Sequence, residues 1–288
     1  MKFDLHCHTR AGSIDARVPL SRYIELLKIQ GFAGLLVTDH DSYRGFRQWK
    51  EEAEAVAIGG AGMAGEPMAG GTDSPADDFV VLKGIEYDTS DAGHFLVIMP
   101  DDVHLDVLTI RGMSVETLVD LVHRYGGILG PAHPFGTKSS SLMYFKKIHR
   151  HPNLIRKFDF IEGFNTCESA RSNYFAQKLA ACWGKPCTGG SDSHVEDYVG
   201  MAYTEFDVDV RCNNDLIAAI RGRKISGFGG EVRGESINAK LKESFVGVWG
   251  FRTYNSFLSL MQARKRSRMI SDICIINDIF LPSEFAAE

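Results

Sequence analysis

Short apolar runs alternate along the chain with stretches that place apolar residues at helical spacing. The apolar runs predict strands at Phe3–Leu5, Leu35–Thr38, Val80–Ile85, Phe95–Met99, Ile128–Ala132, Phe158–Phe164 and Pro186–Gly189. The stretches between them predict amphipathic helices at Leu20–Gln30, Arg44–Ala57, Val115–Tyr125 with Ser114 as its cap, and Ser169–Ala181. This alternation is typical of a parallel α/β architecture, and the seven runs favour a barrel over an open sheet.

Two segments depart from this alternation. Gly59–Asp78 is rich in Gly, Ala, Pro and Asp without periodicity, which predicts a flexible surface insertion able to act as a lid. Beyond about Asp209 a helix near Asn213–Arg223 is followed by the Gly-rich stretch Gly227–Gly234 and by mixed polar sequence. We therefore expect one α/β domain over residues 1–208 and a C-terminal extension over residues 209–288, packed on the domain or following it.

The length, charge and cysteine pattern of the chain exclude several classes of protein. A chain of 288 residues that is 44% hydrophobic can bury the core of one large α/β domain. A net charge of -5 argues against general binding to nucleic acids or membrane surfaces, so no stable nucleic-acid complex is expected. The sequence shows no apolar signal stretch and no apolar run of about eighteen residues, and its six cysteines form no CxxC pair. These features predict a cytoplasmic protein with reduced thiols.

Candidate metal ligands follow the predicted strands. His6 and His8 come after the first run, and a spacing of two in extended chain points both imidazoles to one side. The remaining candidates lie beside other strand ends or in the loop after the first strand: Asp15, His40, Glu86, His94, His133, Asp192 and His194. Catalytic groups of α/β barrels gather at the carboxyl ends of the strands, so these nine residues are expected to converge.

Any one of these histidines alone is more typical of a hydrogen-bonded structural residue than of a ligand. The combination favours metal binding, because His104, His123, His149 and His151 lie instead in helical or loop stretches. Mixed imidazole and carboxylate ligands suit Zn, Mn or Fe, and nine ligands exceed the needs of one ion. We expect two to three divalent ions, whose bound hydroxide attacks a phosphate ester.

The sequence resembles the polymerase and histidinol phosphatase (PHP) superfamily of metal-dependent phosphoesterases. Six motifs between Met1 and Tyr203 carry the resemblance, in the order found in the family: DLHCHT at Asp4–Thr9, VTDHD at Val37–Asp41, GIE at Gly84–Glu86, GHFLVI at Gly93–Ile98, PAHPF at Pro131–Phe135 and GGSDSH at Gly189–His194. The resemblance implies an α/β fold, namely a distorted (β/α)7 barrel of the PHP type with a C-terminal extension, and a trinuclear metal site.

The same resemblance implies how the ligands are shared. His6, His8, Glu86 and Asp192 would hold one metal, Glu86 would bridge to a second metal held by His94 and His133, and Asp15, His40 and His194 would hold the third. Glu86, Asp192 and His194 are also expected to act in catalysis. Family members commonly show Ser-Asp-Gly at the position of Asp15, where this chain has Ser13-Ile14-Asp15-Ala16.

Other residues near these motifs are candidates for supporting roles. Asp39 resembles a partner that fixes the tautomer of an imidazole, although a salt bridge or turn role fits equally well. Arg171 follows a strand end where relatives place a substrate-facing arginine, and Lys138 follows the His133 motif; a solvated surface charge is the alternative for both. Cys7 and Cys167 fit small buried residues or metal neighbours. The basic cluster Arg264–Arg268 fits a solvated helix face or a contact to a polyanion.

Three functions remain open at this point. The first is a phosphoesterase acting on a small phosphorylated substrate such as a nucleotide, a short oligonucleotide or a sugar phosphate. The second is a phosphomonoesterase of the histidinol phosphatase kind. The third is a non-catalytic metal-binding module. Missing ligands would have favoured this third function, but the set of ligands is complete.

Overall fold

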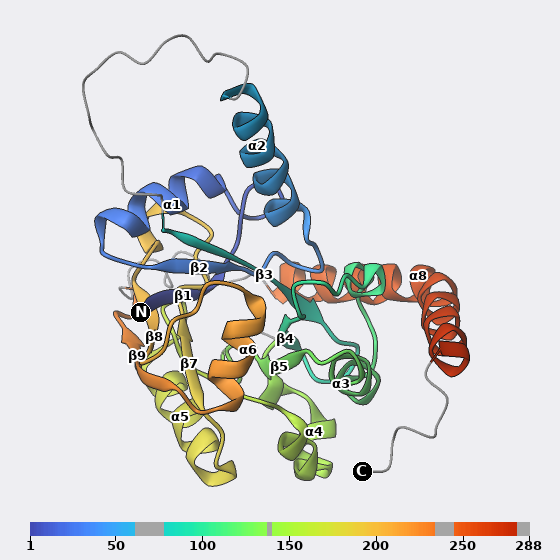
Figure 1. Cartoon of the computed structure of the whole chain (residues 1–288). Helices are drawn as coiled ribbons and strands as arrows, with labels where there is room; N and C mark the ends of the chain where they lie inside the picture. Colours follow the sequence, from blue (N-terminus) through green and yellow to red (C-terminus); the bar gives the residue numbers. More distant parts are fainter. Residues whose placement is uncertain (61–77, 137–139, 234–244, 281–288) are drawn as a thin grey trace, which may run out of the picture.

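The apolar runs form the strands of a curled sheet (Figure 1). The computed structural model describes residues 1–60, 78–136, 140–233 and 245–280. The strands are β1 (Lys2–Cys7), β2 (Gly34–Val37), β3 (Val80–Asp88), β4 (His94–Ile98), β5 (Ile128–Pro131), β6 (Ile161–Asn165), β7 (Cys187–Gly190), β8 (Ala202–Phe206) and β9 (Ile225–Gly230). Seven of them form a sheet in the order β5-β4-β3-β2-β1-β8-β9, and β6 pairs with β7. The fold is therefore mixed α/β around a sheet that bends toward a barrel.

The direction of β4 differs from the expectation of a parallel sheet. β1, β2 and β3 are parallel, but β4 runs antiparallel to both β3 and β5. Only Thr89–Gly93 separate β3 from β4, and so short a connection permits a hairpin but no crossover between parallel strands. His94 consequently enters the site from the start of its strand.

Backbone contacts bring β7 beside β1. The amide of Asp192 donates to the carbonyl of His6 at 2.8 Å, and the amide of His8 donates to that of Ser193 at 3.2 Å. A Cβ on Gly190 would collide with Cβ of His6, so the two strands approach closely only because residue 190 is glycine. On the β6 side of the pair, the amide of Asp159, shortly before β6, donates to the carbonyl of Leu129 in β5.

Helices and short 3-10 turns surround the strands (Figure 1). They are α1 (Leu20–Ile29), α2 (Arg44–Gly60), η1 (Asp106–Thr109), α3 (Val115–Arg124), η2 (Leu142–Tyr144), α4 (Lys146–Arg150), η3 (Pro152–Lys157), α5 (Ala170–Trp183), η4 (Glu196–Tyr198), α6 (Asn213–Arg221) and α8 (Phe245–Phe280). Ser114 caps α3 as the sequence predicts, because its side chain accepts a hydrogen bond from the amide of Thr117.

An apolar plug fills the inside of the curled sheet below the site. Phe3, Leu36 and Phe160 are buried there and belong to one cluster with Leu216 and Ile220 of α6. Burial of this set stabilises the strands, since each fully buried large apolar side chain contributes about 1.5–3 kcal/mol. The polar side chains at the other end of the strands are thus held in place by strands that a well-packed apolar cluster stabilises.

The C-terminal part of the chain continues the fold. β9 pairs antiparallel with β8, so the Gly-rich stretch contributes a strand. Beyond it, α8 begins at Phe245, and the sequence analysis anticipated this helix only at the basic cluster Arg264–Arg268. Residues 61–77, which make up most of the predicted insertion and lid at Gly59–Asp78, lie outside the described residues. None of the described helices is both long and apolar enough to cross a bilayer.

Candidate metal centre

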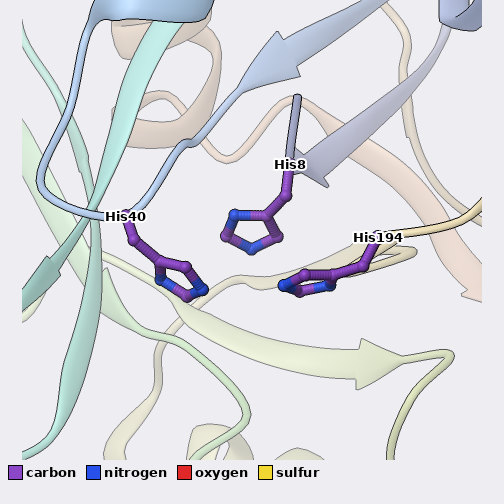
Figure 2. Close-up of side chains that lie close together, drawn as sticks. All are labelled: His8, His40 and His194. Atoms are coloured by element: carbon purple, nitrogen blue, oxygen red, sulfur yellow. The ribbon is translucent and has the colours of Figure 1, made fainter. Parts of the chain in front are cut away.

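The structure brings the nine predicted ligands together at one end of the strands. Six of them lie in or shortly after a strand of the seven-stranded sheet, namely His6, His8, His40, Glu86, His94 and His133. Asp15 lies in the loop after β1, and Asp192 and His194 follow β7. Figure 2 shows three of the rings, those of His8, His40 and His194, turned toward one another from separate segments. The ring centroid of His8 lies 4.3 Å from each of the other two.

Glu86 lies at the centre of this group. Its Oε1 atom lies 2.9 Å from Nδ1 of His94 and 2.9 Å from Nε2 of His133. Its Oε2 atom lies 2.8 Å from Nδ1 of His40 and 3.3 Å from Nε2 of His8. The side chain is fully buried, so this carboxylate can compensate positive charge on two sides at once.

A second arrangement involves the two histidines of the first motif. Nε2 of His6 and Nε2 of His8 lie 3.0 Å apart, and Oδ1 of Asp192 lies 3.5 Å and 3.2 Å from them. Two ring nitrogens and two carboxylates, those of Asp192 and Glu86, thus point at one small region. This is the arrangement that a divalent ion with nitrogen and oxygen ligands requires.

A third arrangement lies closer to solvent. Oδ2 of Asp15 lies 3.4 Å from Nε2 of His194 and 3.7 Å from Nε2 of His40. The Asp15 side chain is 55% exposed, whereas those of His40 and His194 are 25% and 22% exposed. The ligand atoms of His8, His40 and His194 also lie close enough together to share an ion.

Charges in the cluster shift the pKa values in opposite directions. Burial by itself would lower the pKa of His6, but the carboxylates of Glu162, Asp192 and Glu86 raise it well above the usual value. Burial together with the neighbouring His194 and His40 lowers the pKa of His8 to about 4. Burial would raise the pKa of Glu86, yet the surrounding imidazoles hold it well below its usual range. Metal-free, the cluster is a set of ionised carboxylates that share protons with imidazoles.

Three non-glycine residues at the site have a left-handed backbone. The φ angles are 45° at Asp41, 31° at His133 and 51° at Asp192. Backbone conformations of this kind cost free energy and persist where surrounding contacts impose them. Here the amide of Asp192 donates to His6, and that of Asp41 donates to the carbonyl of Glu86. The strained residues therefore carry or adjoin the candidate ligands.

Comparison with known proteins adds a family match. A family model described as PHP-associated matches residues 170–225, which run from α5 to the start of β9. No curated protein matches the chain in sequence. Among solved structures, PsfC from Pseudomonas syringae PB-5123 superposes with a TM-score of 0.55 at 17% identity, over 93% of this chain and 98% of its own.

Two further structures share the fold. One is a two-domain protein from Bacteroides vulgatus ATCC 8482 that contains a predicted PHP-like metal-dependent phosphoesterase; it has a TM-score of 0.54 at 17% identity, over 78% of this chain and 63% of its own. The other is Endonuclease Q in complex with a 27-mer duplex, with a TM-score of 0.53 at 18% identity, over 79% of this chain and 57% of its own. The chain thus matches a PHP-associated family model over part of its length and resembles these structures in fold. At these identities the structural matches speak for the fold alone.

The site contains a carboxylate that the sequence analysis missed. Oε1 of Glu162 lies 2.7 Å from Nδ1 of His6, and its Oε2 accepts hydrogen bonds from the amide of His133 and from the side chain of Asn165. Asn165 also donates to Oδ2 of Asp192 at 3.3 Å. A charged residue inside the otherwise apolar run Phe158–Phe164 was the signal available.

Asp39 supports a different imidazole from the adjacent one. It accepts hydrogen bonds from the amide and hydroxyl of Thr9 and from the hydroxyl of Ser13. The Ser13 hydroxyl in turn lies 3.2 Å from Nδ1 of His8 and accepts from the amide of His40. Asp39 therefore acts through Ser13 on the ring of His8.

The contacts of Arg171 and of the two cysteines are to groups other than the side chains of the cluster. Arg171 is exposed at the start of α5, and its guanidinium lies 5.5 Å from the ring of Phe175. Lys138 lies outside the described residues. Cys7 and Cys167 are buried, and their thiols face backbone carbonyls, Cys7 toward Asp4 and Cys167 toward Asp192. Neither thiol belongs to a metal-binding group of the described residues.

The residues of the centre fit divalent metal ions. Oε2 of Glu86 is buried and accepts no hydrogen bond from the described residues, although Nδ1 of His40 lies 2.8 Å away. Buried polar atoms without a partner are rare in proteins and often mark the place of a ligand. The donors around this atom are imidazole nitrogens and carboxylate oxygens, the ligands that Zn, Mn and Fe accept.

Proposed function

We propose that the protein is a metal-dependent phosphoesterase that hydrolyses the phosphate esters of a small substrate. The convergence of nine imidazole and carboxylate side chains around the buried Glu86 carries this proposal. Structural relatives that include a PHP-like phosphoesterase and a DNA endonuclease support it. Divalent ions bound there would lower the pKa of a water molecule and neutralise charge on the phosphoryl group.

We infer a division of the ligands among three ions, with Zn, Mn or Fe as the candidates. His6, His8, Asp192 and Glu86 would hold the first ion, in keeping with the short distances among them. Glu86, His94 and His133 would hold the second, and Asp15, His40 and His194 the third. The exposure of Asp15 makes the third position the most open to solvent and to substrate.

The chain's own residues prepare the site in this proposal. Glu162 holds the proton on Nδ1 of His6, so that Nε2 faces Asp192 with its lone pair. Ser13 and Asp39 do the same for His8. Glu86, Asp192 and His194 would lie nearest the reacting phosphate, because they belong to the groups at the centre and at the open side.

The substrate would be a nucleotide, a short oligonucleotide or a sugar phosphate, taken up without a stable nucleic-acid complex. Endonuclease Q acts on a DNA duplex, which supports a phosphate ester of the nucleotide class. Arg171 would bind substrate phosphate from the edge of the site, with Lys138 as the second candidate. Histidinol phosphate remains an alternative substrate, and a non-catalytic metal-binding module the alternative role.

The domain arrangement belongs to the same proposal. Residues 1–208 would form a distorted (β/α)7 barrel, closed where β6 and β7 lie between β5 and β1. Residues 209–288 would be the extension packed on it. Pairing of β9 with β8 and burial of Leu216 of α6 in the sheet's apolar plug support the packed arrangement.

The proposed function is tested by Asp192→Ala combined with His194→Ala. Wild-type protein is expected to hold two or more metal ions by elemental analysis. It should also release phosphate from nucleotides, short oligonucleotides, sugar phosphates or histidinol phosphate with Mn or Zn. The double variant should lose metal and turnover while its circular dichroism stays unchanged, because the ligands stand on a separate apolar base.

A matched control is His149→Ala, which changes an exposed histidine in α4 outside the centre. It should keep full metal content and turnover. A double variant that retains both would overturn the site, whereas wild-type protein with metal but without turnover on any substrate would favour the binding module.

A further inference from the structure

A cavity lies at the end of the strands opposite to the metal centre. Its volume is about 540 Å³, and it is bounded by the segments that lead into β6 and β7 and by the turn between α6 and β9. Lys185 of this cavity precedes β7, whereas the candidate ligand Asp192 follows it. The strand therefore separates the two sites, and the side chains of the cavity take no part in the proposed metal binding.

The lining of this cavity is positively charged, although the chain as a whole is acidic. Five of its side chains are lysine or arginine and two are carboxylates, in a chain with a net charge of -5. Both carboxylates have partners: Oδ2 of Asp159 lies 2.8 Å from Nε2 of His123, and Oδ1 of Asp120 lies 3.5 Å from Nζ of Lys157. The other four cations of the lining are Arg156, Lys185, Arg221 and Arg223. Among the residues that the structure describes, no carboxylate forms an ion pair with any of these four.

Backbone carbonyls hold three of the four cations in place. Nη2 of Arg221 donates to the carbonyl of Gly127 at 3.0 Å, and Nη2 of Arg223 donates to that of Gly184 at 2.6 Å. Nζ of Lys185 donates to two carbonyls at the end of η3. A neutral acceptor orients a cationic group without cancelling its charge, and a guanidinium has five N–H donors. The remaining donors of these groups are therefore free to bind an anion.

The cations of the cavity also act on one another. Burial lowers the pKa of Lys185, Asp159 works against this effect, and the positive charges of Arg223 and Arg156 lower the pKa further. The guanidinium of Arg156 in turn lies 5.4 Å from the ring of Trp183, a favourable contact that holds it beside the cavity. Like charges at such distances repel, and an anion bound between them relieves the repulsion.

The turn after α6 places one of the arginines in an unusual backbone conformation. The helix ends in a Schellman motif, in which the amide of Arg223 donates to the carbonyl of Ile220 at 3.1 Å and the amide of Lys224 donates to that of Ala219 at 2.8 Å. Glycine is the usual residue at the left-handed position of this motif, but here that position is Arg223, with a φ of 55°. Strained non-glycine residues cluster at functional sites, which makes this guanidinium a candidate anion ligand.

We propose that this cavity is a binding site for an oligophosphate, a small anion with two or more linked phosphate groups. The site is separate from the metal centre, so the proposal does not depend on the proposed function. Four cations from three segments surround the cavity, and arginine forks match phosphate oxygens. Its volume lies within the about 300–1,000 Å³ of known ligand cavities, which favours a phosphate chain over a single phosphate. A free oligophosphate and the phosphate chain of a nucleoside triphosphate share this chemistry.

The test titrates the full-length, metal-loaded protein with tripolyphosphate, ATP and inorganic phosphate while the fluorescence of Trp183 is followed. This side chain lines the cavity, so Trp183→Phe should abolish the signal. Tripolyphosphate should bind about tenfold or more tightly than inorganic phosphate. Tighter binding of ATP than of tripolyphosphate would identify a nucleotide as the ligand, and the reverse order would identify a free chain. Elemental analysis after the titration checks that the metal content is unchanged, because phosphate chains also bind metal ions.

Two matched variants separate binding from a structural role. Arg223→Gly should weaken tripolyphosphate binding about tenfold or more, since charge-assisted hydrogen bonds are lost. Its unfolding temperature should stay equal or rise, because glycine adopts the left-handed backbone without strain. Lys224→Ala removes the same charge from an exposed neighbour that does not line the cavity, and it should keep wild-type affinity. Equal losses of affinity in the two variants, or equal binding of tripolyphosphate and inorganic phosphate by wild-type protein, would overturn the site.

Discussion

Nδ1 of His6 lies 2.7 Å from Oε1 of Glu162, and both side chains are fully buried. Because the contact occupies one ring nitrogen, Nε2 of the same ring faces Asp192 and Glu86. The carboxylate thus determines which nitrogen is offered to a metal. Partners of this kind orient metal-binding imidazoles and make them more basic.

Glu162→Gln should therefore weaken metal binding without removing any ligand. The neutral amide keeps the shape of the side chain but loses the charge that favours a proton on Nδ1, so an affinity loss of about 10–100-fold is expected. Competition with a chelator measures it. Glu205→Gln, at an exposed position of β8, is the control. Wild-type affinity in the Glu162 variant would show that His6 needs no orienting partner.

The number of ions lost should depend on which carboxylate is changed. Glu86 contacts imidazoles on both sides, whereas the ion pairs that Asp15 forms with described residues are those to His40 and His194. Glu86→Gln should leave at most one ion per chain after dialysis, and Asp15→Asn should remove a single ion. Elemental analysis of the two variants beside wild type measures this. Equal losses would contradict the proposed division of ligands.

Metal affinity should rise with pH. Burial alone would lower the pKa values of His6, His40 and His133, but the nearby carboxylates raise them above the usual value, so these rings hold their protons to a higher pH than a free imidazole does. An incoming metal must displace them, and each displaced proton weakens binding about tenfold per pH unit of acidification. His8, with a pKa of about 4, is already neutral and adds nothing.

Calorimetry at pH 8 and pH 6, in buffers with different protonation enthalpies, would count the released protons. The expected result is net proton release together with weaker binding at pH 6. An affinity independent of pH would mean that the imidazoles are neutral before the metal arrives.

Gly190→Ala should displace His6 and thereby weaken the metal centre. The added methyl group would collide with His6, and overpacking of this kind costs about 1–3 kcal/mol and displaces the side chain. A lower unfolding temperature and weaker metal binding are expected. Gly227→Ala in β9 is the matched control, because its methyl group would meet the flexible end of Glu205. A Gly190 variant as stable as the control would argue against close contact between β7 and β1.

The sequence predicted seven of the nine described strands, all but β8 and β9, and the residues that gather at the strand ends. His40, His133 and His194 directly follow segments whose apolar runs identify them as buried, and that position alone implies convergence. The motif pattern also placed Glu86 between the histidines. These predictions succeeded because a strand ends where its apolar run gives way to polar residues, and this change is visible in the local sequence.

Features that depend on distant contacts were missed. Glu162 lies inside a strand, so only the pairing of β6 with its neighbours shows that it meets His6. The alternation predicted a parallel β4, but this strand is antiparallel to both of its neighbours. Local pattern also predicted no strand at the Gly-rich β9, because glycine is uncommon in strands. The length of helix α8 was missed, apart from a helix face at Arg264–Arg268, because apolar residues surround the helix without one clear stripe.

The pairing of the chain after β7 with the end of β1 has a consequence for the order of folding. His6 stands near the start of the polypeptide, but Asp192 and His194 are synthesised only after all strands from β1 to β7. A growing chain can form β1, β2 and β3 early, yet it cannot complete the first ligand group until the β7 segment has emerged and closed against β1. Metal uptake therefore reports on the finished domain, and a chain that stops before β7 would expose its histidines without gathering them.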